Sequence, residues 1–330
     1  MTLSEAAPGV YAWVQPDGSW FINNAGAIHG GDDVVLIDTC ATASRTRRFL
    51  GAVADATGGA PIRLAVNTHW HGDHTFGNAL LPASTVLIGH EHTRNDILAD
   101  TMLATELSSI WTPTPDWGLS QTRAPTVVLR HDLTLFAGDH RIDLRHPGHE
   151  AHTQGDVVAW LPRHRVLFAG DLLFHHVTPL VLQGSIAGAL RSMDWLRQFP
   201  AERIIPGHGP VLDDAELAEV LDAQTRYYQL IQHTARAGQA AGRTPVQAAH
   251  DCDLGEFASW PDPHRIVLNL HRAYADATGD AIDLISAFTD AITFNGGPFD
   301  CAVNHDTWVP GLRDISAPDE IAGRRQPNTD

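Results

Sequence analysis

Four side chains of the kind that bind metal ions stand within six positions of this sequence, directly after a predicted strand. The strand is Ile62–Val66, and the loop behind it has the pattern His69-x-His71-x-Asp73-His74. Imidazole and carboxylate groups suit zinc and similar divalent cations. The alternative is a polar loop that is rich in histidine by chance, but four adjacent titratable groups would repel or desolvate one another without a cation. The loop therefore predicts a metal site at the end of a strand.

Three further ligand-type side chains stand near the ends of later predicted strands. These side chains are His152, just before the strand Val157–Leu161, Asp171, at the end of Arg165–Ala169, and His208, after Arg203–Ile205. The loops at strand ends converge in layered folds of strands and helices, and sites form there. We therefore expect all three side chains to join the metal site.

The ordered set of these motifs resembles the metallo-β-lactamase superfamily. Asp38, at the end of the strand that starts at Asp33, resembles the first motif of that family, a structural support for the ligand loop. The matching segments run from about residue 10 to about residue 210. The resemblance implies an α/β fold, an αββα sandwich of two mixed β-sheets flanked by helices.

The resemblance also implies how the ligands are shared between two metal ions, which we expect to be Zn²⁺, with iron or manganese as alternatives. The first ion would be held by His69, His71 and His152, the second by Asp73, His74 and His208, and Asp171 would bridge the two. His149 is an alternative to His152. His152 fits better, because it is followed by Thr and then, two positions on, by Gly, as in the family.

The expected chemistry is hydrolysis. Two cations that share a water lower its pKa from near 16 towards about 7, which gives a hydroxide at neutral pH. This metal-bridging hydroxide would attack a carbonyl, and one metal would neutralise the charge that develops on the oxygen. We expect Asp73 to be the catalytic residue that orients the nucleophile and accepts a proton.

The sequence changes character after about residue 212. Residues 1–212 are predicted to form the catalytic domain, and residues 213–330 a mainly helical C-terminal extension. Asp213 and Glu216 have the spacing of a helix-capping pair, and Pro263–Ala275 and Ala281–Ile292 have helical patterns. We expect the extension to border the mouth of the active site and the residues after Ile315 to form a frayed tail.

A hairpin is predicted near the start of the chain. Its strands would be Val10–Val14 and Trp20–Ile22, joined by a turn around Asp17 and Gly18.

Charge and composition limit the partners. The chain has 22 Lys and Arg against 39 Asp and Glu, a net charge of -17, and it contains no Lys. A nucleic-acid surface needs a basic stripe, so we expect a small-molecule substrate and no nucleic acid. No apolar stretch approaches the roughly 20 residues of a membrane span, and we identify no signal peptide. We expect a cytoplasmic protein without a membrane partner, and a homodimer is left open.

Four side chains outside the motifs are candidates for the rim of the substrate site. They are His175, His176, Trp111 and Trp117. The two histidines follow Asp171 closely, and the tryptophans could line a pocket, although a solvated loop and a large core would account for them equally well.

An ester or lactone is the expected substrate. β-Lactamase activity is an alternative, but true β-lactamases of the superfamily usually have Cys or Ser where this chain has Asp171. Thioesterase activity on glutathione conjugates is another, but the extension lacks a cluster of basic residues; Arg226, Arg236 and Arg243 are spread along it. An iron-dependent sulfur dioxygenase would use only some of the ligands, and a non-catalytic scaffold should have lost some of them.

Overall fold

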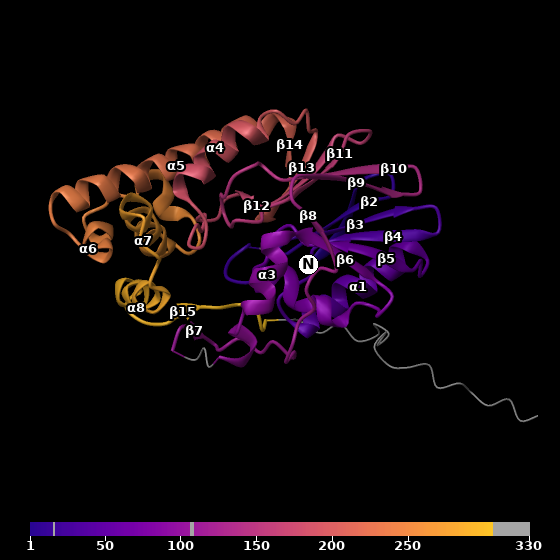
Figure 1. Ribbon diagram of the computed structural model, residues 1–330, viewed down its shortest axis with the longest axis horizontal. Coiled ribbons are helices and arrows are strands. Elements are labelled where there is room, and N and C mark those ends of the chain that lie inside the picture. Colours follow the sequence, from indigo (N-terminus) through magenta and orange to yellow (C-terminus); the bar gives the residue numbers. More distant parts are fainter. Residues whose placement is uncertain (16, 106–108, 306–330) are drawn as a thin grey trace, which may run out of the picture.

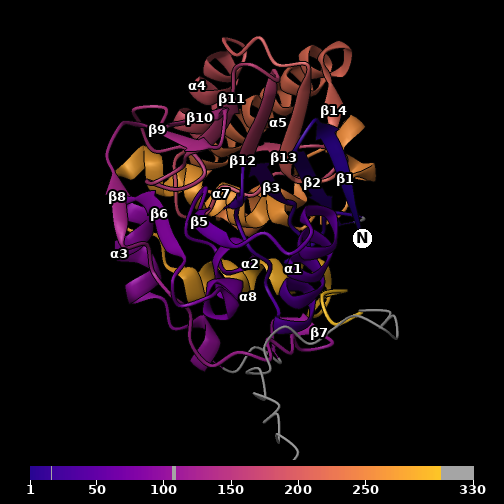
Figure 2. The same cartoon turned by 90° about the vertical axis from the view of Figure 1, so that its right-hand side faces the viewer.

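Two β-sheets pack face to face, and helices cover their outer sides (Figures 1 and 2). The computed structural model describes residues 1–15, 17–105 and 109–305, so the tail expected after Ile315 lies outside the described residues. The first sheet has the order β1 (Thr2–Ala7), β2 (Val10–Val14), β3 (Ala25–Gly30), β4 (Asp33–Ile37), β5 (Ile62–Val66), β6 (Val86–His90), β8 (Val127–Leu129). The second has the order β14 (Leu212–Asp213), β13 (Arg203–His208), β12 (Val166–Phe174), β11 (Val158–Leu161), β10 (His140–Arg145), β9 (Asp132–Ala137).

Side-chain alternation along the strands builds the two faces of the first sheet. In β4, Val35 and Ile37 point into the core between the sheets, whereas Val34 and Leu36 point to the outer face. The outer face is covered by α1 (Ala43–Thr57), which contributes Phe49 to that cluster. Successive strand residues face opposite sides of a sheet, so this nearly continuous apolar strand is buried on both faces. The αββα sandwich expected from the sequence is therefore confirmed.

Both sheets are mixed, and their parallel strands determine where the site lies. β4, β5 and β6 are parallel neighbours in the first sheet, and β12 and β13 are parallel in the second. The carboxyl ends of parallel strands meet at one edge of a sheet. This edge carries α2 (Gly72–Thr75) and the short 3-10 helix η1 (Phe76–Leu80) after β5, and α3 (Glu91–Ala99) and η2 (Met102–Ala104) after β6.

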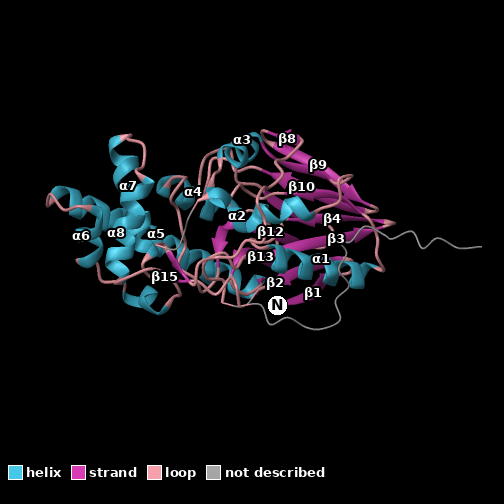
Figure 3. Cartoon of the chain, turned by 90° about the horizontal axis from the view of Figure 1, so that it is seen from below, coloured by secondary structure: helices cyan, strands magenta, loops and turns pink. Residues whose placement is uncertain are grey.

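The C-terminal region is helical, as the sequence predicts. α4 (Ile186–Leu196) lies on the second sheet; α5 (Asp214–Ala240), α6 (Pro245–His250), η3 (Gly255–Ser259), α7 (Arg265–Thr278) and α8 (Leu284–Asn295) follow it. Figure 3 shows α5 to α8 gathered at one end of the molecule. Asp213 and Glu216 form the expected capping box of α5. The chain then returns to pair β15 (Phe299–Asp300) with β7 (Trp111–Thr112). Among the described helices, none has the length and apolar character needed to cross a membrane.

The predicted N-terminal hairpin is wrong. β2 pairs with β1 and β3, and residues 20–22 form no strand. Phe21 has a φ of 63°, in the left-handed region, which is incompatible with a strand and is unusual for a bulky side chain. Trp20 and Phe21 are buried in an aromatic cluster with Trp111 instead.

This aromatic cluster includes a buried histidine from the extension. The indole N–H of Trp20 donates to Nε2 of His264 at 2.9 Å, and the ring of His264 stacks on Phe299 with centroids 4.1 Å apart. Burial, aided by the neighbouring Arg265 charge, lowers the pKa of His264 to about 3. His264 is therefore neutral in the folded protein over the whole neutral range.

The low pKa of His264 makes stability depend on pH. Below about pH 6.5 the unfolded chain binds a proton at His264 that the folded chain cannot bind, so stability falls as the pH falls towards about 3. His264→Gln keeps an acceptor for Trp20 and removes the titration. Between about pH 7.5 and pH 5, we expect the wild type to lose about 1–2 kcal/mol more free energy of unfolding than the variant, measured by denaturant titration. Parallel pH profiles for the two proteins would contradict this assignment.

Candidate metal centre

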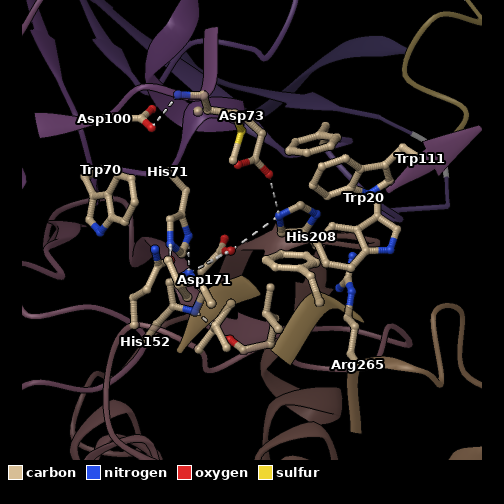
Figure 4. Close-up of a pocket in the computed structure, with 18 of the residues that line it drawn as sticks. Trp20, Trp70, His71, Asp73, Asp100, Trp111, His152, Asp171, His208 and Arg265 are labelled. Carbon is tan, nitrogen blue, oxygen red and sulfur yellow. Dashed lines mark hydrogen bonds and ion pairs between the residues drawn. The ribbon is translucent and has the colours of Figure 1, made fainter. Parts of the chain in front are cut away.

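The structure brings the seven predicted ligand side chains together at the edge where the parallel strands end. Figure 4 shows His71, Asp73, His152, Asp171 and His208 of this set. The seven side chains form two groups, and within each group the ligand atoms lie within 4.8 Å of one another. One group is His69, His71, His152 and Asp171, and the other is Asp73, His74 and His208. Six of the seven are buried, and His71 is half-buried.

Each histidine of the first group has its outer ring nitrogen fixed by a hydrogen bond. Nδ1 of His152 donates to the carbonyl oxygen of Leu180 at 2.7 Å, and Nε2 of His71 donates to Oε1 of Gln183 at 2.9 Å. The inner nitrogens, Nε2 of His152 and Nδ1 of His71, are 2.8 Å apart. Because each outer nitrogen carries the proton, each inner nitrogen is left with a lone pair that faces the group.

The second group is held in the same way from other parts of the chain. Nδ1 of His74 donates to Oδ2 of Asp38 at 2.8 Å, and Nδ1 of His208 donates to the carbonyl oxygen of Gly18 at 2.9 Å. Nε2 of His208 lies 3.1 Å from Oδ2 of Asp73. Both rings therefore present Nε2 to the space beside Asp73.

Asp171 lies between the two groups. Its Oδ2 is 3.3 Å from Nε2 of His152 and 3.4 Å from Nε2 of His208, and its Oδ1 is 3.1 Å from Nε2 of His74. One carboxylate thus contacts imidazoles of both groups, which is the position that the resemblance implies for a bridging ligand.

Unpartnered buried atoms show that the two groups fit a metal ion. Nε2 of His69, Nε2 of His74 and Oδ1 of Asp171 are buried, and none makes a hydrogen bond of good geometry among the described residues, although the last two atoms lie 3.1 Å apart. A buried polar atom without a partner costs about 1–3 kcal/mol, and native proteins rarely leave several side by side. A cation satisfies such atoms, so the donor set fits a borderline divalent metal.

The protonation states of the ligand side chains also favour a bound cation. Burial lowers the pKa of His152 to about 3, which leaves it neutral with a free lone pair. Burial also opposes a charge on His208, but Asp171 and Asp73 outweigh it and raise the pKa of His208 to about 9. Burial opposes ionisation of Asp73, but His74 and His208 hold its pKa at about 2. The carboxylates are therefore ionised at neutral pH and need a nearby positive charge.

Asp38 connects the ligand loop to the end of β4. Its Oδ1 accepts from the backbone N–H of Thr68 and its Oδ2 from the Thr68 hydroxyl, both at 2.7 Å. The same Oδ2 accepts from His74, and Oγ1 of Thr68 lies 3.0 Å from Nδ1 of His69. One buried carboxylate therefore orients a histidine of each group: His74 of the second group directly, and His69 of the first group through Thr68.

A cavity of about 250 Å³ opens beside the two groups. Its walls combine ligand side chains with a large apolar surface, to which both the sandwich and the helical C-terminal region contribute. The apolar lining consists of Trp20, Phe21, Trp70, Met102, Trp111, Phe174, Leu180, Leu182, Leu284 and Phe288. Leu284 and Phe288 come from α8, so the extension borders the cavity, as the sequence predicts.

Arg265 is the one lysine or arginine among the described residues that line the cavity, and its guanidinium is already engaged. Nη2 lies 2.7 Å from Oδ2 of Asp262, and Nη1 donates to the carbonyl oxygen of Thr178 at 2.9 Å. The guanidinium also lies over the ring of Trp20, 4.5 Å from its centroid. This cation is therefore paired within the protein.

Of the four rim candidates, Trp111 lines the cavity and the other three do not. Trp117 packs edge-on against Phe21 in the core. His175 is buried and its Nδ1 donates to the carbonyl oxygen of Pro210, and His176 is exposed. Sequence reasoning missed Gln183 and Asp100, which also line the cavity, because neither belongs to a motif.

Comparison with known proteins agrees with the fold and the site. A model of the metallo-beta-lactamase superfamily matches residues 18–208. A hydroxyacylglutathione hydrolase of Synechococcus sp. (strain JA-3-3Ab) is 28% identical over 215 residues, 62% of this chain and 73% of the relative. A hydroxyacylglutathione hydrolase of Bartonella henselae is 35% identical over 139 residues, 40% of this chain and 53% of the relative. This second match thus spans about half of the relative's length.

A solved structure with the same fold extends into the C-terminal region. The inverting sec-alkylsulfatase Pisa1 from Pseudomonas sp. is 18% identical, with a TM-score of 0.64 over 86% of this chain and 51% of the sulfatase. At that identity the likeness concerns the fold alone.

The contacts of Asp38 predict a loss of metal affinity in Asp38→Asn. The amide keeps the volume of the side chain, but its nitrogen cannot accept from His74 or Thr68. Loss of such a supporting contact typically weakens metal binding about 10–100-fold, which a chelator competition with zinc would measure. Asp33→Asn is the matched control, because Asp33 begins the strand that Asp38 follows and forms an exposed ion pair with Arg63. Equal zinc affinity in the two folded variants would show that Asp38 does not support the ligands.

Proposed function

Because this chain belongs to the metallo-β-lactamase superfamily and is a metal-dependent hydrolase, we propose that it hydrolyses a neutral ester or lactone with two zinc ions. His69, His71 and His152 would hold one ion, Asp73, His74 and His208 would hold the other, and Asp171 would face both. The observation that carries the substrate class is the cavity, which joins these ligands to an apolar wall and one paired arginine.

When bound, the ions supply positive charge beside the scissile carbonyl and lower the pKa of a shared water. The remaining steps belong to side chains of the protein. Asp73 is ionised at neutral pH, since its pKa is about 2, and it lines the cavity. Its carboxylate can therefore orient the attacking water and accept its proton. The aromatic wall excludes bulk water and strengthens these interactions.

Charge complementarity supports a neutral substrate. Arg265, the cation of the cavity wall, is paired with Asp262 and buried, and Asp100 and Asp73 add acidic groups to the wall. A substrate with free carboxylates would meet acidic groups and no unpaired lysine or arginine among the described lining residues. An apolar or aromatic substituent, in contrast, would fit against Trp20, Trp111 and Phe288.

A thioester of glutathione is the second candidate, and the relatives named hydroxyacylglutathione hydrolase favour it. Hydrolysis of a thioester would use the same attack on a carbonyl. The charge of the cavity wall argues against it, because the glutathione moiety carries two carboxylates. β-Lactamase activity, an iron-dependent sulfur dioxygenase and a non-catalytic scaffold rank lower, because the full ligand set with Asp171 is retained.

The remaining expectations are part of the proposal. We propose one catalytic domain over residues 1–212 with an extension over residues 213–330, a cytoplasmic location, a small-molecule substrate, and neither a nucleic-acid nor a membrane partner.

An activity panel tests the substrate class. The zinc-loaded protein is assayed with p-nitrophenyl esters, aliphatic and aromatic lactones, S-lactoylglutathione, nitrocefin and bis-p-nitrophenyl phosphate at equal concentration. We expect the highest kcat/KM for an ester or lactone with an apolar substituent. Asp73→Ala, which removes a ligand and the proton acceptor together, should lose activity by a factor of at least about 10³.

Other results of the panel would change the assignment in defined ways. A kcat/KM for S-lactoylglutathione about tenfold above every ester and lactone would replace the ester assignment with a thioesterase. The same margin for nitrocefin or the phosphodiester would exclude the carboxyl-ester class. Near-normal kcat in metal-loaded Asp73→Ala would remove the role assigned to Asp73.

A further inference from the structure

One loop fixes two histidines of the first group. The loop comprises residues 178–183, between β12 and α4. Within it, the carbonyl oxygen of Leu180 accepts from Nδ1 of His152, and the side chain of Gln183 accepts from Nε2 of His71. The position of this loop therefore decides which ring nitrogen each histidine turns to the centre. We call it the ligand-orienting loop.

The ligand-orienting loop is held by the C-terminal extension. Asn269, on α7, is fully buried, and its Oδ1 accepts from the backbone N–H of Val181 at 2.7 Å. Its Nδ2 donates to the carbonyl oxygen of Pro179 at 2.8 Å. Pro179 and Val181 are the neighbours of Leu180, so a single side chain fixes the backbone on both sides of the carbonyl that accepts from His152.

The amide of Asn269 is itself fixed. Its Nδ2 also donates to the hydroxyl oxygen of Tyr227, on α5, at 2.9 Å. Both polar atoms of the Asn269 side chain thus have partners, and two helices of the extension, α5 and α7, take part. These three hydrogen bonds fix the orientation of the amide, because its oxygen must face a backbone N–H and its nitrogen must face two acceptor oxygens.

Further contacts attach the loop to the same helix. One turn before Asn269, Arg265 donates to the carbonyl oxygen of Thr178, the first residue of the loop. Near the end of α7, Asp276 accepts from the backbone N–H of Ile186, at the start of α4 just after the loop, at 3.0 Å. Directly after the loop the chain lies close to the His152 segment, since a Cβ on Gly184 would approach the carbonyl oxygen of Ala151 to 2.0 Å. The loop is therefore held between α7 and the segment that carries His152.

We propose that Asn269 is a positioning residue through which the helical extension sets the zinc affinity of the first group and not of the second. The inference rests on the proposed function, because it takes the two groups as zinc sites. Asn269 acts through Leu180 on His152, and the loop that it holds also carries the partner of His71. The second group is oriented by Asp38 and Gly18, which lie far from Asn269 in the sequence and belong to the catalytic domain.

The test separates the two groups by removing one at a time. His208→Ala removes a ligand of the second group, and His69→Ala removes a ligand of the first. Asn269→Ala and the milder Asn269→Ser are placed in each background, and zinc binding to the metal-free proteins is measured by titration calorimetry. We expect zinc affinity to fall about 10–100-fold in the His208→Ala background and to change less than about twofold in the His69→Ala background.

A matched control distinguishes positioning from general loss of stability. Val267 is fully buried on α7 and lies about 200° around the helix from Asn269. Val267→Ala should lower the thermal unfolding temperature of the metal-free protein but leave zinc affinity unchanged in both backgrounds. The unfolding temperature of each Asn269 variant is recorded in the same way.

Each remaining result has a defined meaning. Equal weakening in both backgrounds, unchanged affinity in a folded Asn269 variant, or a loss in Val267→Ala as large as that in Asn269→Ala would overturn the proposal. Failure of the wild-type protein to bind zinc at either group would instead overturn the proposed function.

Discussion

The centre depends on one buried negative charge, the carboxylate of Asp171. It contacts imidazoles of both ligand groups, and burial, which opposes its ionisation, is outweighed by the surrounding histidines, led by His208 and His74, so that its pKa lies well below the usual range. The close approach requires glycine beside it. A Cβ at Gly207 would lie 1.8 Å from Oδ1 of Asp171, and a Cβ at Gly170, which has a φ of 53°, would lie 2.8 Å from Cβ of Thr68. The glycine before His208 is thus required by packing against the Asp171 carboxylate, and the glycine before Asp171 by packing against Thr68.

The orientation of the ligands is distributed over the whole chain. His208 is held by the N-terminal segment through Gly18, His74 by Asp38 at the end of β4, and His152 by the loop that α7 supports. Each imidazole presents one defined nitrogen because another part of the fold occupies the other nitrogen. The αββα sandwich therefore does more than bring seven side chains together, since it also selects their tautomers.

The sequence predicts those parts of the site that are encoded by patterns within a short stretch of residues. The motif loop after β5, the segment before β11 and the strands β12 and β13 contain all seven ligand-type residues. The capping box at Asp213 is also visible from residue spacing alone. The irregular path through Phe21 is not, because it results from packing against Trp111, 90 residues away. Gln183 and Asn269 were missed for the same reason. Their partners lie about 90 to 110 residues away in the sequence, and no local pattern reports such contacts.

One side of the cavity could be predicted from short motifs and the other side could not. Its metal-ligand side follows from motifs, whereas its apolar side combines Trp20, Trp111 and Phe288, which meet only in the folded chain. The same apolar side holds Arg265, whose charge is neutralised by Asp262.

The metal content of the purified protein tests directly whether the two ligand groups hold two ions. Seven buried or half-buried ligand side chains in two groups around one carboxylate should hold two divalent ions, so elemental analysis by mass spectrometry should find close to two equivalents of zinc per chain. One equivalent of iron and no second metal would contradict the dinuclear zinc centre and would favour the redox alternative.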